Sequence, residues 1–118
     1  VYSVGRDGRV LFANAAALRM LGRTSAETIG AGAHEILRHG REDGLDYDAS
    51  ACPILRTLED GVARRVENEV FYRKDGGGFP VEYSAAPLHD ASGGVAGCVV
   101  CFHDVTERRR AEAARQSQ

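Results

Sequence analysis

The residues that decide the fold lie between positions 64 and 103. Separated by KDGG and HDASGG, three runs read RRVENEVFYR (64–73), GFPVEYSAAPL (78–88) and VAGCVVCFH (95–103). Four apolar residues of the middle run alternate with their neighbours, namely Phe79, Val81, Tyr83 and Ala85. Alternation is typical of a strand with one buried face, and glycine-rich separators favour tight turns. The stretch predicts three antiparallel strands, with limited pairing near Pro80 and Pro87 because proline donates no backbone N–H.

The preceding half of the chain predicts a hairpin followed by helices. Residues 2–5 and 10–13 are β-prone and flank an Asp-Gly pair, which is a strong hairpin signal. Asn14 can then cap a small-residue helix that Gly22 ends in a left-handed conformation. Thr24-Ser-Ala-Glu27 has the spacing of a capping box and predicts a second short helix.

The remaining segments complete the order of elements. Residues 33–38 are expected to form another turn or two of helix, and the polar residues 39–50 a loop. Ser50 can cap a helix over residues 51–60 with Pro53 in its first turn, and residues 104–118 are helical in composition. Two strands, several short helices and three strands predict an α+β fold, with an antiparallel sheet and helices on one face.

Composition restricts the class of protein. The chain has 118 residues, 43% of them hydrophobic and 27% charged, which suits one globular domain. Lys and Arg number 15 against 17 Asp and Glu, so no nucleic-acid partner is predicted. No apolar run reaches the length of a membrane span, so no membrane insertion is expected. Three cysteines cannot all pair within the chain, which favours a reducing, cytoplasmic location.

The ordered motifs resemble the PAS domain family of bacterial sensory modules over residues 1–110. The matching pieces are Arg6-Asp-Gly-Arg9, Asn14 to Gly22, Arg73-Lys74-Asp75-Gly76, Pro87 with Gly93-Gly94, Gly97 to Phe102, and Asp104-Val-Thr-Glu-Arg108. A further segment, with His39, Asp43-Gly44 and Cys52-Pro53-Ile54, is similar to a bacterial PAS subgroup. The resemblance implies the PAS fold, which is a five-stranded antiparallel sheet with short helices around a small cavity.

The resemblance also implies a function. Residues 1–104 would be the PAS domain, and residues 105–118 the start of a C-terminal signalling or linker helix. The implied role is a sensory and dimerisation module, a homodimer that relays cavity occupancy to an output domain in the same chain. That output domain is expected to be a histidine kinase of a two-component system, with a diguanylate cyclase as the next choice. A ligand-free protein-interaction module and a haem or flavin redox sensor are the alternatives.

The family pattern places a set of apolar side chains around the cavity. The expected lining is Leu18, Ile36, Ile54, Leu58, Phe71, Phe79, Val81, Val100 and Phe102. Such a lining suits either a small apolar ligand or a cavity filled by its own side chains. The same pattern points Cys98 inward, and it leaves Val99, Cys101 and His103 on the outer face.

The expected signal relay is Asp104, Thr106 and Glu107. Asp104 or Thr106 can accept backbone N–H groups where the strand becomes a helix. The alternative is an ordinary helix cap without a signalling role. Residues 108–110 are all arginine and are expected on a solvated helix face, where Arg108 can pair with Glu112.

The cofactor motifs of the family are not matched, and the ligand stays unknown. Flavin-binding relatives carry a reactive cysteine in Asn-Cys-Arg and a glutamine at the position of Phe102. Here Cys52 precedes a proline instead, and the chain has no tryptophan. Haem-binding relatives take a histidine from the helix before the three strands. Residues 51–60 contain none, which leaves His34 or His39 as the alternative ligands.

Neither the cysteines nor the sequence motifs predict a metal-binding or catalytic site. Cys98 and Cys101 are three apart on a strand, so they point to opposite faces and cannot hold one metal ion. Cys52 lies near a helix start, which leaves a redox thiol as the alternative to packing. No Gly-x-Ser-x-Gly, Walker or His-Glu-x-x-His motif is present, so no catalytic residue and no metal site are predicted. The chain itself is not expected to be an enzyme.

Overall fold

The computed structural model describes residues 1–34, 40–41 and 52–116. The expected strands are present as β1 (Tyr2–Gly5), β2 (Val10–Ala13), β4 (Arg64–Tyr72), β5 (Gly78–His89) and β6 (Val95–Asp104). Neighbouring strands are antiparallel in the order β2-β1-β6-β5-β4-β3. The last of these, β3 (Gly40–Arg41), is a two-residue strand at the edge of β4, within a segment for which the sequence predicted a loop.

The described helices are α1 (Ala15–Leu21), α2 (Ser25–Thr28), α4 (Pro53–Asp60) and α5 (Thr106–Gln116). Two of them, α1 and α2, begin at their predicted caps. The Asn14 side chain accepts the first cap hydrogen bond of α1, and Thr24 and Glu27 form both bonds of the capping box. The helix predicted from residue 51 begins instead at Pro53, and Cys52 takes its N-cap position. Ser50, the cap suggested by the sequence, lies outside the described residues.

Pairing along β5 is limited at both of its prolines, as the sequence suggested, because each proline pairs with a neighbouring strand on one side only. Pro80 still pairs with β4, and Pro87 still pairs with β6. On the opposite sides, β6 ends beside Val81 and β4 begins beside Ala85. Alternate residues of a strand direct their N–H groups toward alternate neighbours. Each proline therefore lacks its N–H on the side where the neighbouring strand has ended.

The core lies between the inner face of the sheet and the helices. The four alternating residues of β5 are each at most 2% exposed, and Cys98, Val100 and Phe102 of β6 are buried with them. Val99, Cys101 and His103 are more exposed, in agreement with the outward position that the family pattern implied. Helix α4 packs against β4, β5 and β6, and α1 contributes Ala17 and Leu21 to the same core.

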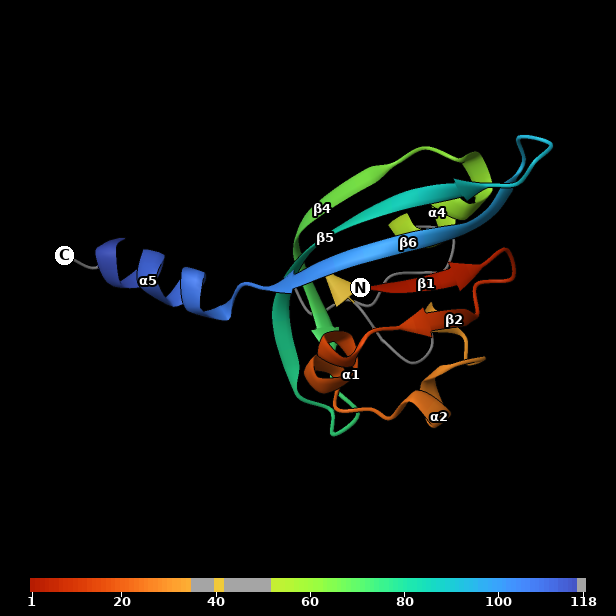
Figure 1. The fold of residues 1–118 in the computed structure, drawn as a ribbon. Coiled ribbons are helices and arrows are strands. Elements are labelled where there is room, and N and C mark those ends of the chain that lie inside the picture. The colour runs from red at the N-terminus through yellow and green to blue at the C-terminus, as the bar shows by residue number, and fades with distance from the viewer. Residues whose placement is uncertain (35–39, 42–51, 117–118) are drawn as a thin grey trace.

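Helix α5 stands apart from this body. Figure 1 shows it projecting from the end of β6, away from the sheet and from the other helices. The molecule accordingly measures 55 Å along its longest axis and 29 and 23 Å along the others. Val105, at the root of the helix, is 5% exposed, whereas Ala111 and Ala114 further along α5 are exposed. The sheet and the start of α5 thus meet at a single junction.

Candidate functional site

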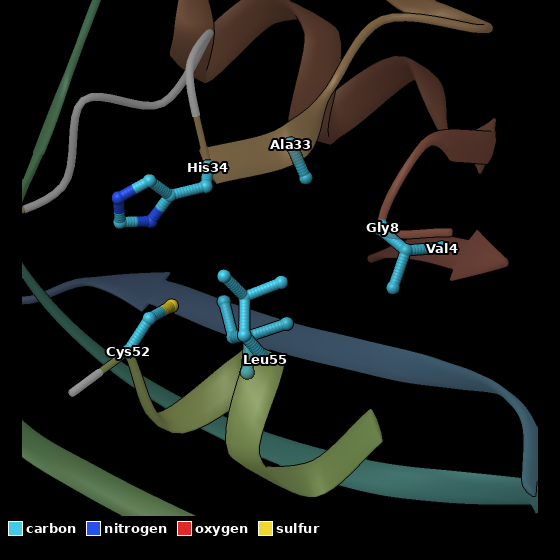
Figure 2. A pocket seen from close by; sticks show the side chains of 7 residues that line it. Val4, Gly8, Ala33, His34, Cys52 and Leu55 are labelled. Carbon is cyan, nitrogen blue, oxygen red and sulfur yellow. The ribbon is translucent and has the colours of Figure 1, made fainter. Parts of the chain in front are cut away.

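A small pocket lies between the start of α4, the Ala33–His34 segment and β1 (Figure 2). Its lining is Val4, Gly8, Ala33, His34, Cys52, Ile54 and Leu55. His34 and Cys52 stand toward one end, and Val4 and Gly8 toward the other. The space open to the centre of a water molecule is about 10 Å³, which is room for a single water. Of the cavity residues that the sequence suggested, Ile54 borders this pocket.

The other suggested lining residues form the packed core. Phe71, Phe79, Val81, Val100 and Phe102 are each at most 3% exposed, and Leu58 packs against the core while partly buried. The centre of the Phe71 ring lies 5.2 Å from that of Phe102 and 5.4 Å from that of Tyr83. Leu18 is half-buried, and Ile36 lies outside the described residues. The described side chains therefore fill the sheet side of the expected cavity themselves.

Neither flavin nor haem fits the described residues. Phe102 stands where flavin-binding relatives offer an amide, and its ring packs edge-on against Tyr2 at 6.0 Å between centres. His34 borders a pocket with room for about one water, which is far smaller than a porphyrin. His39, the other histidine considered for haem, lies outside the described residues.

The interior also holds polar groups that the sequence analysis missed. Glu69 on β4 is 0% exposed, and Tyr2 and Tyr83 are each 2% exposed. The Tyr2 hydroxyl has no hydrogen-bond partner among the described residues. Burial raises the pKa of the Tyr83 hydroxyl, and the charge of nearby Glu69 raises it further. Glu69 shares its strand parity with Phe71, and this parity was the available signal that its side chain faces inward.

The predicted relay residues gather where β6 becomes α5. Asp104, Thr106 and Glu107 line one open cleft, together with Arg73 and Arg110. Asp104 Oδ1 accepts a hydrogen bond from the Thr106 backbone N–H at 2.9 Å and another from the Thr106 hydroxyl at 2.5 Å. Arg73 Nη2 lies 3.8 Å from Asp104 Oδ2. The aspartate therefore connects the end of the strand, the first residue of the helix and the end of the β4–β5 hairpin.

Two consecutive arginines attach the first turn of α5 to the sheet. The Arg108 guanidinium donates two hydrogen bonds to the Glu82 carboxylate, and Arg65 lies 3.7 Å from the same carboxylate. The hydrogen bond from Arg108 lowers the pKa of Glu82 below its usual value. Arg109 Nη2 donates to Asn68 Oδ1 at 2.8 Å. These contacts were not anticipated, because they join residues far apart in the sequence.

The cysteines lie as the strand alternation predicted. Cys98 is fully buried and Cys101 is partly exposed, so the two thiols are on opposite faces of the sheet. Cys52 is 1% exposed at the start of α4. Within the described ranges, no three His, Cys, Asp or Glu side chains gather as they would to hold a metal ion.

None of the described helices is both long enough and apolar enough to cross a bilayer.

Comparison with known proteins identifies the fold and the family. The family model for the PAS domain matches residues 1–107. The PAS domain of a Colwellia psychrerythraea protein aligns with a TM-score of 0.71 at 18% identity, covering 90% of this chain and 86% of that one. The light-state dimer of the fungal blue-light photoreceptor Vivid gives 0.68 at 20% identity, covering 87% and 75%. The PAS domain from the fruit-fly ELK potassium channel gives 0.64 at 14%, covering 89% and 85%.

Proposed function

The chain belongs to the PAS domain family, and on this premise we propose that it is a sensory and dimerisation module of a bacterial signal-transduction protein. Residues 1–104 receive the signal in the cytoplasm. The junction at Asp104, Thr106 and Glu107 relays it into residues 105–118, the start of the signalling helix. The output domain in the same protein is a histidine kinase, and the chain itself supplies no catalysis.

The observation that carries this proposal is the attachment of α5. Asp104 bonds to the helix start and lies beside Arg73, while Arg108 bonds to Glu82 on β5. Beyond these contacts the helix projects away from the domain (Figure 1). A displacement of the sheet must therefore move the root of α5, and a ligand that favours one arrangement shifts the population of both.

Dimerisation is part of the same proposal. The likeness to the fungal photoreceptor Vivid, whose light-state structure is a dimer, supports it. We place the contact on the outer face of the sheet, around Val99, Cys101 and His103, and along α5.

A second candidate function is a ligand-free PAS module that only sets dimer geometry. The small pocket and the packed aromatic core favour it, because they leave room for about one water among the described residues.

Native mass spectrometry of the purified chain separates these two functions. A sensory module is expected to carry a bound small molecule in part of the population, and its removal is expected to shift the NMR signals of the α5 amides. A homogeneous ligand-free mass from every expression host, with α5 signals indifferent to added metabolite extract, would support the interaction module instead.

A further inference from the structure

A β-bulge interrupts β4 close to the root of α5. The pairing runs Val66 with Tyr83 and then Glu69 with Val81. Two residues, Glu67 and Asn68, therefore stand opposite the single residue Glu82 of β5. Asn68 has φ of 62°, and no other non-glycine residue in the described part of the chain has a positive φ. Asparagine tolerates this left-handed conformation better than most residues, but glycine adopts it at lower cost.

Two side chains of α5 bond to this bulge, one to each of the two strands that form it. Arg108 bonds to Glu82, the residue opposite the bulge, and Arg109 bonds to Asn68 within it. The Glu82 side chain is only 15% exposed, so its pair with Arg108 is shielded more than an ordinary surface pair. The first turn of the helix is thus fixed to the irregular site of the sheet.

The bulge also decides which side chains enter the core. Residues three apart on a regular strand point to opposite faces, yet Val66 and Glu69 both pack inward. Glu69 is fully buried, and the Tyr83 hydroxyl lies close enough to feel its charge. A buried carboxyl is costly in an apolar interior and responds strongly to any change in its hydrogen bonding. One short segment therefore faces the interior through Glu69 and faces α5 through Asn68.

We propose that Asn68 and Arg109 are positioning residues of the relay, and that the β4 bulge transmits changes in the hydrogen bonding of buried Glu69 to α5. This inference rests on the proposed sensory function and adds a route separate from Asp104.

Amide-hydrogen exchange in α5, measured by NMR on the 118-residue chain, tests the route without any ligand. Glu69→Gln keeps the shape of the side chain and removes its charge. We expect it to change exchange in the first turn of α5 by roughly threefold. Glu67→Gln is the matched control, because Glu67 lies in the same bulge but is exposed and lies near Arg65. We expect this control to leave α5 unchanged.

A second pair of variants removes the hydrogen bond between Arg109 and Asn68, which connects α5 to the bulge. Asn68→Gly permits the left-handed backbone and removes the oxygen that accepts from Arg109. In this background, Glu69→Gln is expected to lose its effect on α5. Arg109→Ala is expected to act in the same way, and the combination with Asn68→Gly should add nothing to either single change.

Two results would overturn the proposal. One is unchanged amide exchange in α5 when Glu69→Gln folds normally. The other is an equal effect of Glu69→Gln on this exchange in the original chain and in the Asn68→Gly background. If Glu69→Gln does not fold, Tyr83→Phe removes the hydroxyl beside Glu69 and is judged by the same two criteria. Because the readout needs neither a ligand nor an output domain, this test and the mass-spectrometric test of the sensory function can fail independently.

Discussion

A hydrogen atom in place of a side chain at Gly97 lets β6 lie against β1. A Cβ at this position would run into the carbonyl oxygen of Val4, which belongs to the backbone and cannot move aside cheaply. We expect Gly97→Ala to lower the free energy of unfolding by about 1–3 kcal/mol, the usual cost of overpacking. Urea denaturation measures this change. Ala96→Ser, at the exposed neighbouring position, is the control, and equal stability of the two variants would contradict the assignment.

The three thiols should differ sharply in reactivity. Burial raises the pKa of the Cys98 thiol to about 11, and Cys52 is 1% exposed, whereas Cys101 is partly exposed. In the folded chain at pH 8, iodoacetamide is therefore expected to modify Cys101 ahead of the other two, as mass spectrometry of the peptides would report. Rapid labelling of Cys52 under the same conditions would restore the redox-thiol interpretation of that residue.

Among single residues, the sequence predicted those whose role is local. The caps at Asn14 and Thr24 depend on neighbours three residues away, and both form as expected. Glu69 was missed because a charged side chain is normally solvated, although its parity with Phe71 on β4 indicated that it faces inward. Asn68 was missed because its backbone conformation follows from strand pairing.

At the scale of elements, the junction before α5 rests on Asp104. Asp104→Ala removes the acceptor of the Thr106 N–H and the partner of Arg73, and should lower the free energy of unfolding by about 0.5–2 kcal/mol, as for a lost helix cap. In the full-length protein, we expect the variant to fold and to lose the link between input and output. Asp104→Asn separates the two contacts, because it keeps an acceptor for Thr106 and loses the charge. Normal signalling by the Asp104→Ala variant would indicate that the junction is an ordinary helix cap without a signalling role.

The attachment of α5 to the sheet through the pair between Arg108 and Glu82 should depend on pH. Because the hydrogen bond from Arg108 lowers the pKa of Glu82 from its usual 4.5, the pair stabilises the fold fully above pH 4.5 and is lost as the pH falls below that value. NMR titration between pH 6 and pH 3 should therefore show α5 amides shifting at the acid end. Glu107 and Glu112 of α5 also titrate in this range, so Glu82→Gln should remove only the part of the shift that depends on the pair with Arg108. Glu27→Gln, which breaks a distant pair with Lys74, should leave it intact.

Helices and strands with a strong local pattern were predictable from the sequence, but the contacts between them were not. The strands 2–5 and 10–13 appear within the predicted limits, because alternation and an Asp-Gly turn identify them. Strand β3 was missed because two residues gain strand character only by pairing with β4. Limited pairing at the prolines of β5 was predicted from their missing N–H, but the side on which each proline lacks a partner depends on where β4 and β6 end.

For the whole molecule, we expect a homodimer through the outer face of the sheet. Sedimentation equilibrium should show self-association, and Val99→Arg on that face should weaken it by introducing charge into the contact. Ala91→Arg, in the exposed β5–β6 turn, is the matched control. If Ala91→Arg weakens association as much as Val99→Arg does, the contact lies elsewhere.

The sequence identified the family and the order of elements, but it could not give the interior space. Phe71, Phe79 and Phe102 are buried, as alternation along their strands favours, and their expected place around a cavity stays a prediction. Whether they surround a void depends on how the rings pack against one another, and the contacts between Phe71, Phe102 and Tyr83 show that they meet. Such contacts are set by the whole sheet, so composition does not report them.

Because α5 projects from the domain (Figure 1), a small rotation at its root moves its far end by a larger distance. Its eleven residues span about 16 Å, so a tilt of about 10° at the root carries the far end through about 3 Å. A small rotation at the root of α5 therefore displaces the far end of the helix by a distance comparable to the spacing between neighbouring side chains. Under the proposed sensory function, we expect the signal to be a change in the angle between α5 and the sheet, with the contacts of Asp104 and Glu82 at the root of the helix.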